Sequence, residues 1–128
     1  MSFRQSPRIV VRRTRERGWG VFARRSIACD ELIEEVPVLI FPSADLYRPD
    51  GTSRLADYVY TWDDEHVAIA LGYGSLYNHS YTPNARYIDD DPCVKQYFAI
   101  RDIARGEEIT VNYNAEPEDR SDVGFDVR

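Results

Sequence analysis

The chain of 128 residues has the length of a single domain, and its hydrophobic fraction of 43% is typical of a globular protein. Its net charge of −6 argues against nucleic-acid binding as the main function. No apolar run approaches the roughly 20 residues of a membrane-spanning helix, and the first residues lack the apolar stretch of a signal peptide, so an intracellular protein is expected.

The charge is divided unevenly along the chain. Residues 1–25 hold eight arginines and one acid, which gives a net charge of +7, whereas the remainder holds 8 basic and 21 acidic residues, a net charge of −13. An acidic body suits a basic protein partner, although an acidic surface also keeps a small protein soluble. Arginine supplies all of the basic residues except Lys95.

Short strands dominate the predicted secondary structure. Runs rich in β-branched and aromatic residues predict strands over 9–11, 20–23, 31–36 and 38–41, followed by a turn-rich stretch over 42–54. Residues 58–62 and 67–71 fit either a strand or a short helical turn, and further strands are predicted over 86–88, 94–100 and 109–113. The sequence therefore predicts a mainly β single domain, 1–128, with a core of about 9–113 and a tail, 114–128, that is mobile unless something pins it.

Two segments of the sequence are similar to each other. Residues 22–33 and 98–109 align without gaps, and seven of the twelve positions are identical. The similarity predicts one supersecondary unit used twice, in which a strand runs into a tight turn and a second strand. Gly106 and its counterpart Asp30 fall where this turn needs a left-handed residue.

Cys29 and Cys93 lie far apart in the sequence, without Cys or His neighbours at the spacing of zinc ligands. Two free thiols, buried or without a role, are expected in a reducing compartment, and one disulfide is the alternative. The sequence predicts no metal site.

Three short segments carry the candidate ligand-binding and catalytic side chains. The first, 17–22, places Gly18 and Gly20 around Trp19, which lets the backbone approach a ligand while the indole covers it. It is also typical of a plain turn, and the dinucleotide-binding fingerprint is absent. The third segment, 106–113, is a predicted strand that ends in Tyr113, which by itself indicates only a packed strand.

The second segment, 76–84, is rich in hydrogen-bonding groups. Asn78 can both donate and accept hydrogen bonds, so it can hold an amino-acid-like part of a ligand. His79 as a general base and Ser80 as a nucleophile are alternatives, but no GxSxG elbow surrounds the serine. A metal bound by His79 and His66 lacks further ligands at a suitable spacing. A polar turn without a function explains this segment alone equally well.

Together, the three segments resemble the SET-domain lysine methyltransferases. The pattern is Gly-x-Gly-Val-Phe near the start, Asn-His-Ser followed by Pro-Asn, and Gly-Glu-Glu-Ile-Thr-x-x-Tyr near the end, and the likeness runs from about residue 9 to residue 113. The length is similar to that of the minimal stand-alone SET proteins of a large DNA virus. The resemblance implies a SET domain (β-clip), with several small curved sheets of short strands around a pseudoknot-like crossing made by the C-terminal strand.

The resemblance also implies an activity, the transfer of a methyl group from S-adenosylmethionine to a lysine of a basic protein, a histone tail being one candidate. Gly18, Trp19 and Gly20 are similar to the segment that lines the S-adenosylmethionine pocket through the backbone. Asn78 is expected near the methionine part of this cofactor and His79 near its adenine.

Further positions follow from the same resemblance. Tyr113 is similar to the catalytic tyrosine beside the transferred methyl group, and Tyr58 to an aromatic residue of the substrate-lysine channel. Tyr87 and Phe98 are both candidates for the residue that sets the number of methyl groups; Tyr87 would favour monomethylation and Phe98 would allow further rounds. The zinc clusters of larger family members are absent, and Phe125 in the tail is a candidate to pack on the adenine instead.

Other interpretations remain open at this point. A SET-fold peptide-binding module without catalysis is the main alternative, and the presence of Asn78, His79 and Tyr113 argues against it. A generic β-domain that mediates protein assembly would require all three motifs to be accidental. A minimal domain without capping modules gains buried surface by dimerising, so a homodimer is a candidate assembly.

Overall fold

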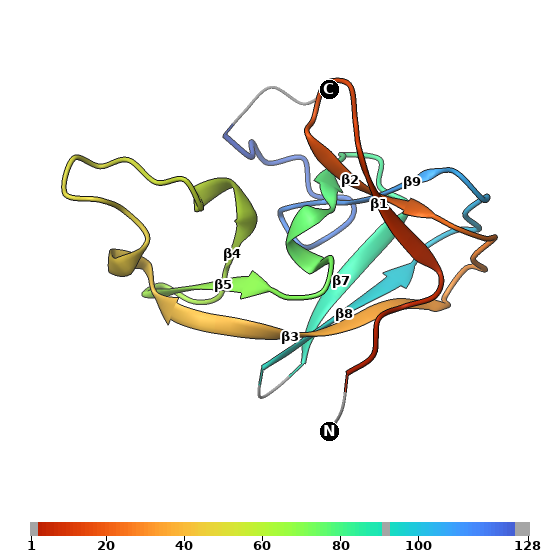
Figure 1. The fold of residues 1–128 in the computed structure, drawn as a ribbon, viewed down its shortest axis with the longest axis horizontal. Helices are drawn as coiled ribbons and strands as arrows, with labels where there is room; N and C mark the ends of the chain where they lie inside the picture. Colours follow the sequence, from red (N-terminus) through yellow and green to blue (C-terminus); the bar gives the residue numbers. More distant parts are fainter. Residues whose placement is uncertain (1–2, 91–92, 125–128) are drawn as a thin grey trace.

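The computed structural model describes residues 3–90 and 93–124 (Figure 1). Within these residues the strands form a four-stranded sheet in the order β1-β2-β9-β6 and a five-stranded sheet in the order β4-β5-β3-β8-β7. The strands are β1 (Ile9–Arg13), β2 (Trp19–Ala23), β3 (Leu32–Pro42), β4 (Val59–Thr61), β5 (His66–Ala70), β6 (Asn78–His79), β7 (Ala85–Asp90), β8 (Val94–Ala99) and β9 (Glu108–Val111). Three 3-10 turns, η1 (Ser43–Asp45), η2 (Ala56–Tyr58) and η3 (Gly74–Leu76), complete the described elements. The prediction of a mainly β chain of small sheets is confirmed.

The predicted strands over 31–36 and 38–41 form one strand, β3, so the predicted break between them is wrong. The first half of β3 pairs with β8 as far as Pro37, and the second half pairs with β5 from Val38 onward. Pro37 therefore stands where β3 changes its partner, and the missing N–H of a proline is tolerated best where a ladder ends.

The two copies of the repeated segment face each other and join the two sheets. Ile27 and Ile103 exchange both backbone hydrogen bonds, with N···O distances of 2.9 and 2.8 Å. The N–H groups of Asp30 and Gly106 each donate to a carbonyl of the opposite copy at 2.8 Å. Both residues have a positive φ, 71° for Asp30 and 86° for Gly106. The prediction of a left-handed residue in this turn is confirmed.

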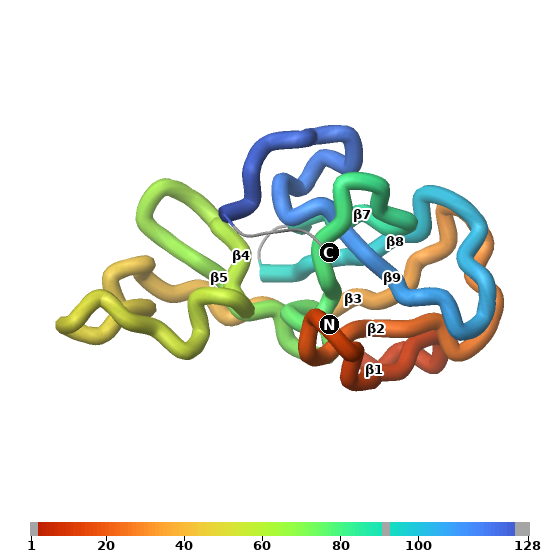
Figure 2. The backbone as a smooth tube through the Cα atoms, turned by 90° about the horizontal axis from the view of Figure 1, so that it is seen from above, coloured from red at the N-terminus to blue at the C-terminus, as the bar shows by residue number. Residues whose placement is uncertain are grey.

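The strand near the end of the chain lies between segments from its beginning and its middle. β9 pairs antiparallel with β2 and parallel with β6. In Figure 2 the blue segment of β9 passes beside the green segment that leads into β7. This is the crossing that the resemblance predicts, and it places Asn78 and His79 next to the strand that leads to Tyr113.

The five-stranded sheet curls until its two edges meet. β4 and β7 lie at opposite ends of the strand order, yet the rings of Tyr60 on β4 and Tyr87 on β7 are 5.0 Å apart. Tyr97 fills the interior of this curl and donates its hydroxyl to the Gly74 carbonyl at 2.9 Å, and its ring stacks on Tyr77 at 4.3 Å. The core of isoleucines, valines and alanines therefore also contains four buried tyrosines, and their hydroxyl groups are hydrogen-bonded.

The segment between β3 and β4, with η1 and η2, projects away from the two sheets (Figure 1). The described part of the tail is held against the body instead. Asn114 Nδ2 and the Tyr81 hydroxyl both donate to the Ser121 carbonyl, at 2.8 and 2.9 Å. Asn114 and Tyr81 thus hold the described tail at Ser121.

Cys29 and Cys93 are free thiols, as expected, and both are exposed rather than buried. Over residues 3–90 and 93–124, no group of three or more His, Cys, Asp or Glu could hold a metal ion. None of the helical turns described in those ranges is long and apolar enough to cross a membrane.

Candidate functional site

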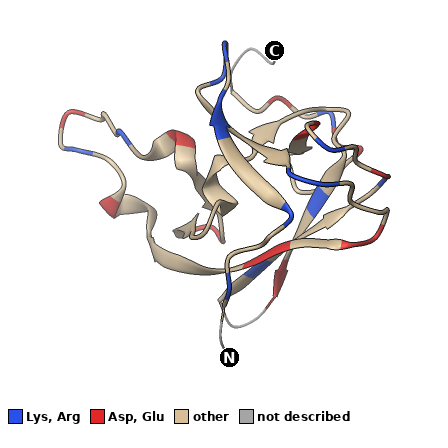
Figure 3. Cartoon of the chain, turned by 45° about the vertical axis from the view of Figure 1, so that its right-hand side comes forward, with Lys and Arg blue, Asp and Glu red and all other residues tan. Residues whose placement is uncertain are grey.

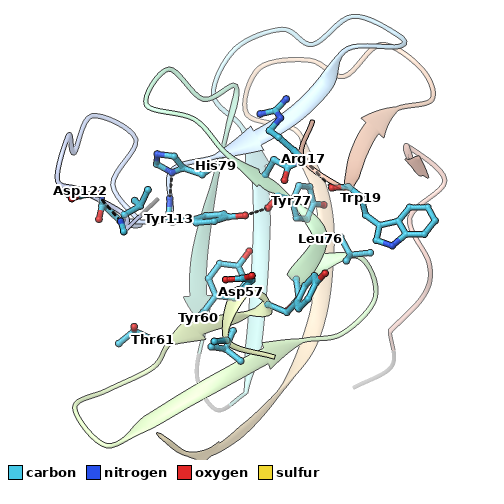
Figure 4. A pocket seen from close by; sticks show the side chains of 18 of the residues that line it. Arg17, Trp19, Asp57, Tyr60, Thr61, Leu76, Tyr77, His79, Tyr113 and Asp122 are labelled. Carbon is cyan, nitrogen blue, oxygen red and sulfur yellow. Dashed lines mark hydrogen bonds between the residues drawn. The ribbon is translucent and has the colours of Figure 1, made fainter. Parts of the chain in front are cut away.

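A pocket of about 920 Å³ opens between β4 and β6 (Figure 4). Its volume falls within the range of about 300–1,000 Å³ that ligand pockets occupy. Trp19, Tyr58, Asn78, His79 and Tyr113, all singled out from the sequence, line its wall. The structure therefore brings the three sequence segments to one cavity.

Glu108 links the three segments, although the sequence analysis did not assign it to the site. Asn78 Nδ2 donates to Glu108 Oε2 at 2.7 Å and to the Trp19 carbonyl at 3.0 Å. The Arg17 guanidinium forms an ion pair with the same carboxylate. Because β9 lies between β2 and β6, its first residue reaches partners on both sides.

Gly20 is the position where the segments pack most closely. A Cβ atom at this residue would lie 2.6 Å from Glu108 Oε2 and 3.1 Å from Asn78 Nδ2, so only glycine fits without a shift. Gly18 has a φ of 68°, which turns the chain into β2. Neither glycine lines the pocket itself; together they present Trp19, whose side chain is 44% exposed and lies under the Arg13 guanidinium.

His79 is buried and linked to the backbone of the late tyrosine. The N–H of Tyr113 donates to His79 Nδ1 at 3.0 Å, so the proton of the neutral ring lies on Nε2. Burial lowers the pKa of His79, which favours this neutral form at pH 7. Its ring packs against Tyr81 at 4.5 Å and Tyr113 at 5.2 Å. These contacts give His79 the role of a neutral wall residue.

The Tyr113 hydroxyl donates to the Tyr77 carbonyl at 2.6 Å, and Figure 4 shows it directed at that residue. Burial raises the pKa of Tyr113 to about 12. The Arg17 guanidinium opposes this rise, and the carboxylates of Asp57 and Glu108 add to it. The phenol is therefore protonated at pH 7, and it donates its proton in a hydrogen bond to the Tyr77 carbonyl.

Tyrosines also build the wall opposite His79. Tyr58 is 42% exposed and lines the pocket, and Tyr60, which the sequence analysis did not single out, lines it beside Tyr113 with ring centroids 6.5 Å apart. Tyr87 does not line the pocket. It lies behind Tyr60 and donates its hydroxyl to the Tyr113 carbonyl at 3.3 Å.

The structure does not bring Phe98 to the pocket. Side chains alternate along β8, and it is Tyr97 that is fully buried in the curl of the sheet. Phe98 lies on the other face, where it lines a separate hollow with Arg86 and Ile88. Of the two candidates for control of the methylation state, only Tyr87 packs near Tyr113.

Phe125 lies outside the described residues. The residues immediately before it, Asp122, Val123 and Gly124, line the pocket, so the described tail borders the candidate site.

The pocket is electronegative. Glu16, Asp57 and Asp122 line it, and its arginine, Arg17, is paired with Glu108. Figure 3 shows basic residues recurring along the β1–β2 hairpin and acidic residues spread over the other segments. Such a pocket favours a positively charged ligand.

Comparisons with known proteins agree with this geometry. Residues 18–114 match the model of the SET domain. The chain is 33% identical over 104 residues to the histone-lysine N-methyltransferase, H3 lysine-37 specific, of Schizosaccharomyces pombe, which covers 80% of this chain and 71% of that protein. It is 31% identical over 121 residues to the histone-lysine N-methyltransferase SUV39H1 of Xenopus laevis, of which it spans 28%.

A solved structure from Plasmodium falciparum, described provisionally as a histone methyltransferase, superposes with a TM-score of 0.64 at 28% identity, and the match covers 86% of this chain and 94% of that one. Motifs, crossing and relatives point to the same conclusion: this chain belongs to the SET-domain family of methyltransferases.

Proposed function

We propose that the chain is an S-adenosylmethionine-dependent protein-lysine N-methyltransferase that acts on a basic protein, with histone H3 as the first candidate substrate. The observation that carries this proposal is the convergence of Trp19, Asn78, His79 and Tyr113 on one electronegative pocket. The relatives named as H3-specific enzymes support histone H3 as the first substrate to test.

The residues present fit the cofactor. The close packing around Gly20 brings the Trp19 carbonyl and the Asn78 amide to one point, a polar cradle suited to an amino-acid moiety. His79 offers a neutral, desolvated ring for a nucleobase, and the carboxylates of Asp57 and Asp122 suit a sulfonium. When bound, S-adenosylmethionine supplies an electrophilic methyl group.

The protein's main task in this reaction is to present a neutral amine in line with that methyl group. Removing the proton from a lysine of reference pKa near 10.4 costs about 4.6 kcal/mol at pH 7. The rings of Tyr58, Tyr60 and Tyr113 lower this cost, because a desolvated aromatic wall disfavours the charged ammonium. Acidic residues at the pocket attract the basic substrate before it is desolvated.

Tyr113 orients the amine. Because its proton is donated to the Tyr77 carbonyl, its oxygen can accept a hydrogen bond from the incoming N–H group. That bond would direct the nitrogen lone pair away from the phenol. The raised pKa keeps the phenol protonated, so it acts by orientation and electrostatics, and the amine proton leaves to solvent before transfer.

The proposal is tested by incubating the purified chain with methyl-labelled S-adenosylmethionine and recombinant histone H3, core histones or a lysate. Label on a substrate lysine, located by mass spectrometry, is the expected result. Self-labelling on lysine is not expected, because the chain's one lysine, Lys95, is fully buried. Cofactor binding and peptide binding without any methyl transfer would instead indicate a peptide-binding module that has lost catalysis.

His79→Ala should weaken S-adenosylmethionine binding by tenfold or more, since it removes the buried ring from the pocket wall and the acceptor of the Tyr113 N–H group. Isothermal titration calorimetry measures the affinity. His66→Ala is the matched control, because His66 pairs with Asp63 away from the pocket. Equal affinities of the two variants would remove His79 from the cofactor site.

Gly20→Ala should also lose cofactor affinity, because the new methyl group would push Glu108 and Asn78 apart. Gly51→Ala serves as the control. It introduces strain of about 1–2 kcal/mol at a φ of 84° with open space around it, and it lies outside the pocket. A Gly20→Ala chain that keeps wild-type affinity would show that the cradle is not part of the binding site.

A further inference from the structure

Lys95 is the one lysine of the chain and has no exposed surface. Its Nζ atom lies 4.1 Å from the ring centroid of Tyr60 and 4.0 Å from that of Tyr87. The ammonium also pairs with the carboxylate of Asp89 on the neighbouring strand. The tyrosine wall of the pocket thus already holds one ammonium group, supplied by the chain itself.

The position of Lys95 relative to the pocket is defined by Tyr60. Tyr60 lines the pocket, whereas Lys95 and Tyr87 do not. Since the Tyr60 ring contacts both the cavity and Lys95 Nζ, the lysine lies behind the wall. Lys95 also bridges the two edges of the curled sheet, because Tyr60 belongs to β4 and Tyr87 to β7.

Stability alone does not explain a buried ammonium at this point. Burial lowers the pKa of Lys95, and the Asp89 carboxylate opposes that change. Replacing a buried ion pair by a well-packed apolar group is often neutral or stabilising. The ammonium instead constrains the separation of the Tyr60 and Tyr87 rings, because a cation attracts the faces of both rings.

We propose that Lys95 is a positioning residue for methyl transfer: its ammonium clamps Tyr60 to Tyr87 and so fixes the width of the inner end of the channel for the substrate lysine. The inference rests on the proposed function. A fixed wall keeps the substrate amine aligned, and it limits the room for an amine that already carries methyl groups. Lys95 therefore affects both the rate and the number of methyl groups added.

The test compares Lys95→Met with the wild-type chain, using recombinant histone H3 as substrate. Methionine is an unbranched side chain only one atom shorter than lysine, and it removes the charge. We expect kcat to fall about tenfold, the loss expected when a desolvated cation–π clamp is removed, with KM changed much less. The ratio of di- and trimethylated to monomethylated product should rise at equal conversion. The near-ultraviolet circular dichroism of the tyrosine cluster should change as well.

Two further variants separate positioning from simple packing. Gln96→Met places the same residue one position along β8, where the side chain is half-buried and bonds to Glu35, and it should leave product ratio and kcat unchanged. Lys95→Arg keeps a cation that can stack on the rings and should restore the wild-type product ratio. If Lys95→Met does not fold, Asp89→Asn, at a side chain that is 39% exposed, should shift the product ratio in the same direction.

A folded Lys95→Met chain with wild-type kcat, product ratio and near-ultraviolet spectrum would overturn the inference and leave the proposed function standing. A wild-type chain that transfers no methyl group to histone H3, core histones or lysate proteins would overturn both.

Discussion

A chain with Tyr113→Phe should bind S-adenosylmethionine like the wild type and transfer methyl groups about 10²–10³ times more slowly, the usual loss when one preorganised polar contact to the transition state is removed. The variant keeps the ring that packs against His79 and Tyr60. It loses the oxygen that is anchored on the Tyr77 carbonyl and that accepts a hydrogen bond from the incoming amine in the proposed reaction. Ground-state binding should therefore survive while alignment of the amine does not.

Single-turnover rates and calorimetric affinities of the same preparations measure the two quantities separately. Tyr73→Phe is the matched control, because it removes a tyrosine hydroxyl that accepts a hydrogen bond from the exposed Gln5 side chain and lies outside the pocket lining. Methyl transfer by Tyr113→Phe at more than one tenth of the Tyr73→Phe rate would exclude the hydroxyl from the mechanism.

The sequence was sufficient for the fold and for the outline of the pocket, because both depend on ordered motifs. Trp19, the Asn78–His79 pair and Tyr113 meet at one pocket, as the order of their motifs in the chain predicts. What the motifs did not identify is the link between them. Glu107 and Glu108 are adjacent acids in the third segment, and nothing local distinguishes the one that bonds Asn84 from the one that bonds Asn78.

Phe98 shows how a strand can mislead a motif-based prediction. Residues 94–100 are largely apolar, so the alternation that separates the two faces of a strand is hidden. Lys95, Tyr97 and Ala99 share one parity with each other, and Phe98 has the opposite parity. Because a lysine usually marks an exposed face, this parity does not identify Tyr97 as the residue of the interior.

Tyr60 and Lys95 illustrate a different limit. Their contact joins β4 to β8, which the curl of the sheet brings together across two intervening strands. Pattern and propensity act over a few residues and cannot specify such a pairing. The sequence showed only that Lys95 is the one lysine among many arginines. Only the structure shows that this lysine is buried against the rings of Tyr60 and Tyr87.

The tyrosine cluster predicts a steep loss of stability at alkaline pH. Burial raises the pKa of five tyrosines above the ordinary value near 10, namely Tyr60, Tyr77, Tyr87, Tyr97 and Tyr113. Above pH 10 the unfolded chain loses these phenolic protons while the folded chain retains them, so the folded state binds more protons and stability falls as pH rises. Lys95, whose pKa is lowered in the folded state, acts in the opposite direction just below pH 10.5, but it is a single group.

Each proton that the folded chain retains lowers the free energy of unfolding by about 1.4 kcal/mol per pH unit. Five tyrosines together lower it by about 7 kcal/mol per pH unit. Because domains are stable by only about 5–15 kcal/mol, the chain should unfold within about two pH units above 10.

Far-ultraviolet circular dichroism and tyrosinate absorbance, followed together, should show unfolding and ionisation of the cluster in one transition, and Tyr87→Phe should make this transition less steep. Gradual ionisation in a chain that keeps its native spectrum would mean that solvent reaches these phenols. The desolvated wall that is proposed to lower the free-energy cost of deprotonating the substrate lysine would then be absent.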